Sequence, residues 1–341
     1  MMGLKIKKKM ANEIRKILLK KSLINLDYKI KRENDYVIIP LIMKPEIEIL
    51  VEYELNETEI IDTDFEKQKK EPRSFKSHLK GRIEDSKIKE IKGSFDIIGE
   101  IVILEIPEDL SEFKNLIGDS ALKFTKRKAV YRKKSEVKGI IRIRELEHIA
   151  GEKISETIHQ EFGCKLILDV KKVYFSPRLA TERKRVADQV KDNEIIVDMF
   201  SGIAPFPILI AKDHNVKIYA IDINPDAYYY AKKNIDLNKV KDRVILVLGD
   251  VNDVLKNEDI KANRIIMNLP GTAYKYLDLA FDTIKNGGII HYYEFSEDFE
   301  NPILRLKKAA IPYKVEILSK RKVRSKSPGI WHIGIDAKVT K

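Results

Sequence analysis

Cysteine, tryptophan and long apolar stretches are scarce in this chain of 341 residues. Its single cysteine, Cys164, cannot build an internal disulfide framework or a zinc site made of cysteines. No apolar run approaches the length that a membrane-spanning helix needs. Charged residues follow Met1–Leu4, where a signal peptide would continue with apolar ones. These absences predict a cytoplasmic protein with no membrane partner and no bound metal.

Positive charge is abundant, and it is clustered. The net charge is +12, with eleven Lys and Arg against four acids in residues 1–35 and ten against one in residues 123–144. A third basic run covers residues 320–326, whereas residues 46–66 hold nine acids and no base. Charge of this amount could simply be solvated surface. Clustering instead favours a polyanionic partner, because each neutralised phosphate releases counterions.

The hydrophobic patterning divides the chain into four segments. Residues 1–66 are predicted to form a small α+β domain, and the polar stretch 67–92 a linker. Residues 93–168 are predicted to form an α+β middle domain. Residues 169–341 alternate strand and helix patterns, which predicts an α/β domain with a doubly wound, mostly parallel sheet. The strands of this sheet are expected at Ile195–Met199, Ile218–Ile223, Val244–Leu248, Ile265–Leu269 and Gly288–Tyr293.

Three of these strands end in an acid. Asp198 precedes a turn of small residues that includes Gly202, Asp222 ends the second strand, and Asp250 follows the third. A carboxylate at the second position can bind both ribose hydroxyls, and one at the third can meet an adenine amino group. Dinucleotide-binding turns carry three glycines for a pyrophosphate. One glycine preceded by an acid suits a cationic sulfonium better, so the pattern is typical of class I methyltransferases that use S-adenosylmethionine.

The fourth strand runs into Asn268-Leu269-Pro270, a sequence that is either an ordinary turn or a substrate-binding motif. A side-chain amide and a carbonyl there can hold the donor and acceptor edge of a planar substrate beside the methyl group. The strand-end acids upstream favour the interpretation as a substrate-binding motif.

The segment before the sheet is dense in polar groups. Ser176 is placed to cap a helix that has Pro177 at its first position. Arg178 and Glu182 are then one turn apart on the same face, which the spacing alone explains as a surface salt bridge.

The chain resembles the archaeal and eukaryotic tRNA (guanine-N1)-methyltransferases over nearly its whole length. These enzymes modify guanosine 37, beside the anticodon. The segments that carry the resemblance, in the order found in the family, are Ser94–Gly99, Lys133–Gly139, Arg142–Gly151, Val173–Leu179, Asp198–Gly202 and Asn268–Pro270.

The resemblance implies roles for individual residues. Glu182 matches the general base, Arg142 the arginine that stabilises charge on guanine O6, and Asn268 the asparagine that grips the substrate. The residues implied to bind S-adenosyl-L-methionine are Tyr174, Arg183, Asp198, Phe200, Gly202, Asp222, Ile223, Asp250, Val251 and Asn268. The residues implied to contact tRNA are Lys126, Arg127, Lys133, Arg142, Arg144, Ser176, Arg178 and Pro270.

Some positions depart from the family pattern. Ala204 replaces a second glycine in the first cofactor loop, and Gly271 replaces a lysine. The tail Ser327–His332 is similar to a subgroup in wyosine synthesis, some members of which also methylate a carbon of the tricyclic derivative of guanosine 37. The resemblance implies a monomer that methylates guanine N1. That second methylation, or an RNA-binding protein with a vestigial cofactor fold, is the alternative.

Overall fold

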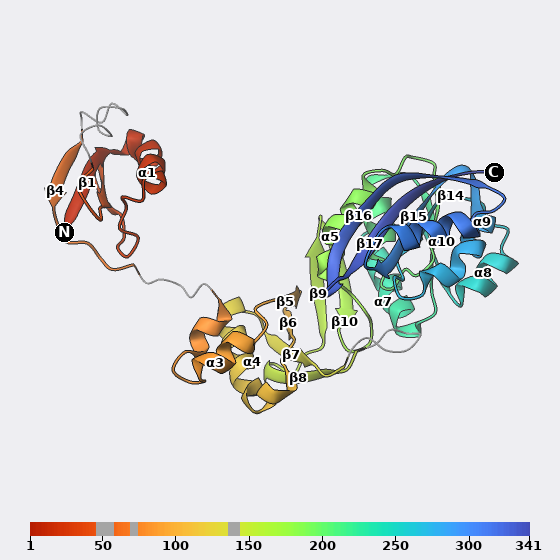
Figure 1. Cartoon of the computed structure of the whole chain (residues 1–341), viewed down its shortest axis with the longest axis horizontal. Coiled ribbons are helices and arrows are strands. Elements are labelled where there is room, and N and C mark those ends of the chain that lie inside the picture. Colours follow the sequence, from red (N-terminus) through yellow and green to blue (C-terminus); the bar gives the residue numbers. More distant parts are fainter. Residues whose placement is uncertain (46–57, 69–73, 136–143) are drawn as a thin grey trace. The chain divides into compact units, whose positions relative to one another are not determined.

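The computed structural model describes residues 1–45, 58–68, 74–135 and 144–341 (Figure 1). The chain divides into two compact units, Met1–Arg73 and Ser74–Lys341. In the described ranges, no helix combines the length and the apolar character needed to span a membrane.

The first unit is an antiparallel sheet with the strand order β2-β3-β1-β4, packed against helix α1. Its elements are β1 (Met2–Lys7), η1 (Lys8–Met10), α1 (Ala11–Lys20), β2 (Lys31–Glu33), β3 (Tyr36–Pro40) and β4 (Glu59–Asp62). Ile14 and Leu18 lie one turn apart on α1 and pack with Leu4 and Ile6 of β1 in a small hydrophobic core. The predicted α+β character of this segment is confirmed.

The second unit begins with a four-stranded sheet in the order β5-β6-β7-β8, with β6 and β7 parallel. The elements of this part are η2 (Phe75–Leu79), α3 (Asp85–Glu90), β5 (Phe95–Ile98), β6 (Ile101–Leu104), η3 (Glu108–Phe113), α4 (Lys114–Thr125), β7 (Ala129–Lys133) and β8 (Leu146–Gly151). Helix α4 packs on this sheet, with Ile117 and Ala121 fully buried.

The prediction of a linker over residues 67–92 is wrong from Ser74 onward. Phe75, Leu79, Ile88 and Ile91 are buried in the core beneath β6 and α4. The polar residues between them hid this pattern, because apolar residues three to four positions apart in two short helices leave most of the sequence charged.

The larger sheet has seven strands in the order β13-β12-β11-β14-β15-β17-β16. Its strands are β11 (Ile195–Asp198), β12 (Lys217–Asp222), β13 (Val244–Leu248), β14 (Ala262–Met267), β15 (Ile284–Ser296), β16 (Lys314–Ser327) and β17 (Ile330–Thr340). The first five are parallel, and β17 and β16 close the order as an antiparallel hairpin. In Figure 1 the long strands β15, β17 and β16 lie side by side.

Helices cover both faces of this sheet, which confirms the doubly wound fold. Ile196 and Val197 are neighbours in β11 but belong to different hydrophobic clusters, as strand alternation requires. Helices α6 and α7 contribute to the first cluster, and α8, α9 and α10 to the second. The remaining elements are η4 (Pro177–Leu179), α5 (Ala180–Ala187), α6 (Pro205–Asp213), α7 (Pro225–Leu237), α8 (Val251–Asn257), η5 (Ala273–Tyr276), α9 (Leu277–Thr283) and α10 (Glu300–Ala309).

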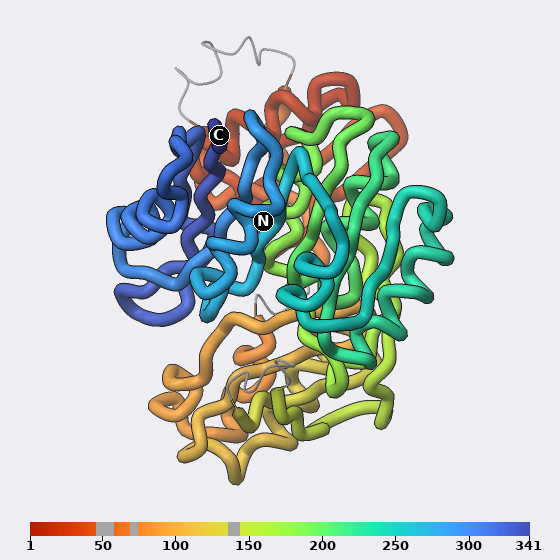
Figure 2. Tube along the Cα trace, turned by 90° about the vertical axis from the view of Figure 1, so that its right-hand side faces the viewer, coloured from red at the N-terminus to blue at the C-terminus, as the bar shows by residue number. Residues whose placement is uncertain are grey.

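A hairpin of β9 (Glu156–Glu161) and β10 (Cys164–Asp169) joins the two parts of this unit. The chain can be followed through this region in Figure 2. Asn234 on α7 accepts a hydrogen bond from the backbone N–H of Ile167 at 2.6 Å and donates to its carbonyl at 3.0 Å. One hydrophobic cluster also runs from the smaller sheet through β10 to the larger one. The hairpin is therefore packed onto the helices of the larger sheet. The sequence pattern places nearly all of it in the middle domain, which is expected to end at residue 168.

A fragment that begins at Ser74 should fold, whereas one that begins at Ile83 should be much less stable. The shorter fragment lacks Phe75 and Leu79, whose side chains are 1% and 0% exposed. Loss of two such side chains costs at least about 4 kcal/mol of the free energy of unfolding. Urea denaturation of the two fragments measures this difference. Equal stability of the two fragments would mean that residues 74–82 act as a linker and do not belong to the core.

Candidate active site

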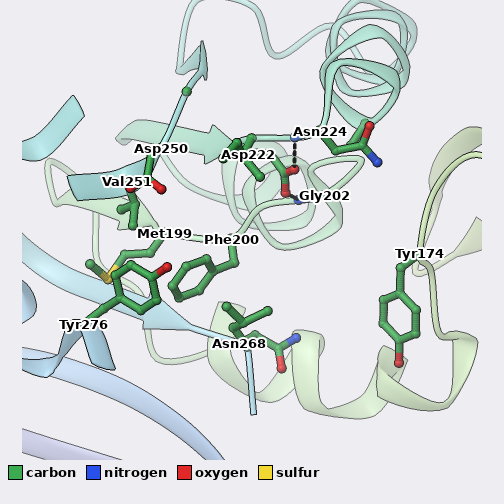
Figure 3. A pocket seen from close by; sticks show the side chains of 14 residues that line it. Tyr174, Met199, Phe200, Gly202, Asp222, Asn224, Asp250, Val251, Asn268 and Tyr276 are labelled. Atoms are coloured by element: carbon green, nitrogen blue, oxygen red, sulfur yellow. Dashed lines mark hydrogen bonds between the residues drawn. The ribbon is translucent and has the colours of Figure 1, made fainter. Parts of the chain in front are cut away.

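The carboxyl ends of neighbouring parallel strands meet in a cleft with an empty volume of about 730 Å³, including its open mouth (Figure 3). This is the edge where the strand order reverses, and doubly wound sheets bind ligands there. The residues that line the cleft are Tyr174, Met199, Phe200, Gly202, Asp222, Ile223, Asn224, Ala227, Gly249, Asp250, Val251, Asn268, Leu269 and Tyr276.

Asp222, at the end of β12, is held in place by backbone groups. Its Oδ2 accepts a hydrogen bond from the N–H of Gly202 at 2.7 Å, and its Oδ1 accepts one from the N–H of Asn224 at 2.9 Å (Figure 3). An ionised carboxylate accepts up to about four hydrogen bonds. Asp222 therefore suits the two hydroxyls of a ribose while it stays fixed to the loop.

A polar group and apolar walls stand at the far side of the cleft. Asp250 follows β13 and caps α8, where its Oδ1 accepts from the N–H of Asn252 at 2.8 Å. Phe200 and Tyr276 pack edge to face with ring centroids 5.1 Å apart. Burial, followed by the charge of Asp250, raises the pKa of the Tyr276 hydroxyl. Aromatic walls beside a carboxylate fit an adenine ring and its amino group.

The turn after β11 brings the backbone close to this space. Gly202 has φ of 56°, in the left-handed region that glycine adopts readily. Ala204 also lies there, with φ of 64°, immediately before Pro205 begins α6. The departure from a second glycine thus keeps the left-handed geometry, at a conformational cost of about 1–2 kcal/mol.

Asp198 lies behind the cleft and does not line it. Its carboxyl is 1% exposed, and its Oδ2 has no hydrogen-bond partner among the described residues. Burial, with the negative charge of Asp222 adding to it, raises the pKa of Asp198 to about 8. The surroundings of Asp198 therefore favour its protonated form, and its side chain is not among those that line the cleft.

Two further contacts link the last strands of the sheet to residues at the cleft. Beyond Asn268 and Leu269, the carbonyl of Pro270 accepts a hydrogen bond from the N–H of Phe295 at 3.0 Å. Across the mouth, Arg324 on β16 donates to the hydroxyl of Tyr174 at 3.2 Å. The last strands of the sheet thus border the entrance.

Glu182 is not among the residues that line the cleft. Its carboxylate is 7% exposed and accepts hydrogen bonds from Arg185 at 2.8 Å, Arg321 at 2.9 Å and the hydroxyl of Tyr293 at 2.7 Å. Burial raises its pKa, but the hydrogen bonds from Arg185 and Arg321 outweigh burial and lower it overall. The salt bridge expected from the spacing of Arg178 and Glu182 is wrong, because Arg178 pairs with Asp96 at 2.5 Å.

Arg183 also lies away from the cleft, which does not fit the role implied for it in cofactor binding. Its side chain is 2% exposed and bonds to both carboxylate oxygens of Glu161, at 2.5 and 2.6 Å. A third bond reaches the carbonyl of Ser176 at 3.2 Å. Ser176 precedes Pro177 as expected, but its side chain makes no capping hydrogen bond. These contacts fix the segment before α5.

Part of the implied tRNA-contacting set lies together. Lys133 and Arg178 both pair with Asp96, at 3.6 and 2.5 Å. Arg144 borders a neighbouring apolar hollow that also includes Tyr174, and its Nε is buried without a partner among the described residues. Lys126 and Arg127 lie elsewhere, in the turn that precedes β7. Arg142 is outside the described residues.

Several cleft residues were not expected from the sequence. Tyr276 lies on η5, six positions beyond Pro270, and no local pattern singles it out. Asn224 had a usable signal, because an Asn followed by Pro225 after a strand is typical of a helix cap, and Asn224 does accept from the N–H of Asp226 at 2.9 Å. Met199, Ala227, Gly249 and Leu269 complete the set.

A doubly wound sheet with strand-end carboxylates around such a cleft defines the class I methyltransferase fold. The chain belongs to the TRM5/TYW2 methyltransferase family, whose methyltransferase domain matches residues 157–318. The TYW2 N-terminal domain matches residues 75–155, and the tRNA methyltransferase 5 N-terminal domain matches residues 3–49.

Full-length relatives support this membership. The chain is 43% identical to tRNA (guanine(37)-N(1))-methyltransferase Trm5b of Methanocaldococcus jannaschii, over 99% of this chain and 98% of the relative. The crystal structure of Trm5b from Pyrococcus abyssi superimposes with a TM-score of 0.81 at 39% identity, covering 100% and 99% of the two chains. A complex structure of aTrm5 and tRNALeu gives a TM-score of 0.76 at 41% identity, covering 99% of each protein chain.

The buried carboxyl of Asp198 should make stability depend on pH. Its pKa rises from an ordinary value of 3.8 to about 8 on folding, so the folded state binds the proton more tightly. The stabilisation from this proton is complete below about pH 4 and is lost as pH rises towards 8. Asp198→Asn should flatten this decline in unfolding free energy between pH 5 and 8. A decline of the same steepness in the variant would contradict a protonated Asp198.

Proposed function

We propose that this chain transfers a methyl group from S-adenosyl-L-methionine to N1 of guanosine 37 in tRNA. The observation that carries this is the grouping of Asp222, Asp250 and Asn268 at three strand ends around one cleft. The full-length relative at 43% identity is named for that reaction. The relatives of M. jannaschii and P. abyssi are named for guanine N1 alone, so methylation of the tricyclic derivative is not favoured.

The cleft residues divide the cofactor between them. Asp222 takes the ribose hydroxyls, Asp250 the adenine edge, and Ile223 and Val251 the faces of the ring. Phe200 and Tyr276 would stand as aromatic walls beside Asp250, and the backbone at Gly202 lies against Asp222. When bound, S-adenosylmethionine supplies an electrophilic methyl group on a sulfonium. The protein's task is then to place guanine N1 in line with that methyl group.

Guanine N1 carries a proton and is a poor nucleophile until the proton leaves, so the reaction needs a base. We assign that role to Glu182, as the family resemblance implies. Negative charge then spreads to O6, where the guanidinium of Arg142 can stabilise it. Asn268 and the carbonyl of Pro270 hold the edge of the base, which must be extruded from its stack to reach them. Glu182 would then hold the proton, while guanine N1 would accept the methyl group that the bound cofactor supplies.

Further positions contribute to recognition of tRNA. Arg144 shares a hollow with Tyr174, Ser176 accepts from Arg324, and Lys133 and Arg178 both pair with Asp96. These four side chains would contact the anticodon loop. Lys126 and Arg127 would bind phosphates farther away. We assign recognition of the tRNA body to the first unit, and we propose that the enzyme acts as a monomer.

Nucleoside mass spectrometry tests the reaction itself. An unmodified tRNA transcript incubated with the protein and S-adenosylmethionine should yield 1-methylguanosine, whereas a transcript with adenosine at position 37 should yield none. Methylation of both transcripts would contradict position 37 as the target.

Glu182→Gln separates a catalytic base from a structural ion partner. If Glu182 takes the N1 proton, single-turnover methyl transfer should fall by about 10²–10⁴-fold, and the loss should shrink as pH rises because solvent base then removes the proton. Cofactor affinity should stay near that of the wild type.

Asp336→Asn is the matched control, because Asp336 binds the same two guanidiniums, Arg185 at 2.6 Å and Arg321 at 2.8 Å. A purely structural role predicts that both variants lose stability and that neither loses rate in a way that high pH restores. That outcome would remove Glu182 from the chemical step.

A further inference from the structure

The basic run of residues 320–326 forms part of β16, and its side chains do two different things. Arg321 points into the protein and pairs with Glu182 at 2.9 Å and Asp336 at 2.8 Å. Lys322 and Lys326 are exposed, and neither they nor Arg324 pair with a carboxylate among the described residues. Their positive charge is therefore uncompensated within the part of the chain that the structure describes.

Aromatic rings hold these lysines in place. The ammonium of Lys322 lies 4.5 Å from the centre of the Trp331 ring, and that of Lys326 lies 4.6 Å from the centre of the Phe295 ring. A cation over a ring face is positioned without being neutralised. We call Phe295, Lys322, Arg324, Lys326 and Trp331 the hairpin-tip surface.

The hairpin-tip surface borders the mouth of the cofactor cleft on two sides. Phe295 donates its backbone N–H to the carbonyl of Pro270, directly after Asn268 and Leu269. Arg324 donates to the hydroxyl of Tyr174 at 3.2 Å and to the hydroxyl of Ser176 at 3.5 Å. Its Nε is buried without a hydrogen-bond partner among the described residues. The hairpin-tip surface is thus bonded both to Tyr174, which lines the cleft, and to Pro270, which follows the lining residues Asn268 and Leu269.

We propose that the hairpin-tip surface binds the single-stranded RNA on either side of the methylated nucleotide, with Lys322 and Lys326 on its phosphates and Trp331 and Phe295 beside its bases. The inference rests on the proposed function, because it takes the substrate to be an RNA loop. Uncompensated cations next to partly exposed rings are the combination that single strands favour. An extruded nucleotide leaves its two neighbours unstacked, so phosphates and bases are both within reach of such a surface.

This role goes beyond the part of the chain that matches the methyltransferase domain of the family. That match ends at residue 318, before all three cations of the hairpin-tip surface. The surface would add contacts with the loop beside the cofactor cleft, whose described lining residues all precede β16.

The test compares Lys322→Gln/Lys326→Gln with the control Lys314→Gln/Lys338→Gln in the full-length protein. Lys314 and Lys338 are exposed at the opposite end of the same hairpin, so the control removes equal charge. Binding of unmodified tRNA and of an isolated anticodon stem-loop is measured at several salt concentrations, and cofactor affinity is measured by calorimetry.

The slope of log affinity against log salt should become less steep by about 1.4 in the tip variant, for two single-strand phosphates. The change should occur with both RNAs, while the control keeps the wild-type slope and both variants keep wild-type cofactor affinity. Acrylamide quenching of Trp331, the single tryptophan, should decrease when either RNA binds to the wild type.

An unaltered slope, an equal change in both variants, or a change seen with whole tRNA only would overturn the proposal. The nucleoside assay separates its failure from that of the proposed function. Normal 1-methylguanosine formation with an unaltered slope would reject RNA binding by the hairpin-tip surface and support the proposed reaction. A less steep slope with both RNAs but no 1-methylguanosine would support RNA binding by the hairpin-tip surface and reject the proposed reaction.

Discussion

Asp336 is the buried charge that holds together strands β15, β17 and β16 of the large sheet. It lies in β17, is 2% exposed, and binds His291 of β15, Arg185 of α5 and Arg321 of β16. Burial opposes its ionisation, yet these partners hold its pKa well below the ordinary range. A buried carboxylate is tolerable only when cations and hydrogen bonds surround it. One side chain therefore fixes two strands and a helix relative to each other.

The same cluster sets the state of Glu182. Arg185 and Arg321 are shared between the two carboxylates, so any movement of one is felt by the other. Tyr293 is fully buried, and burial followed by the charge of Glu182 raises its pKa well above the ordinary value, so it stays a hydrogen-bond donor to Glu182. A proton that arrives at Glu182 would weaken both guanidinium contacts. Proton acceptance would thus be coupled to the packing of β16, the strand that carries Arg324 to the cleft.

Much of the cofactor side could be predicted from the sequence, because strand periodicity and strand-end acids are local signals. Asp222 and Asp250 needed only the rule that parallel strands end at one edge of a sheet. Glu161, the partner of Arg183, lies 22 positions away and is set by tertiary packing, which no spacing rule reveals. Phe75 and Leu79 were missed because their short helices are mostly charged. Asp198 was recognised as a site acid, but its protonation depends on burial from several elements.

Strand β16 is also the free edge of the seven-stranded sheet, with β17 as its neighbour among the described strands. An edge of 14 residues exposes a long row of unpaired backbone groups that could template another chain. Its register against β17 shifts three times, and Lys314, Lys320, Lys322 and Lys326 are among its exposed residues. Bulges and like charges are the devices that keep such edges from pairing with their own copies. The same lysines that surround the hairpin tip would therefore also oppose pairing of this edge with the edge of a second copy.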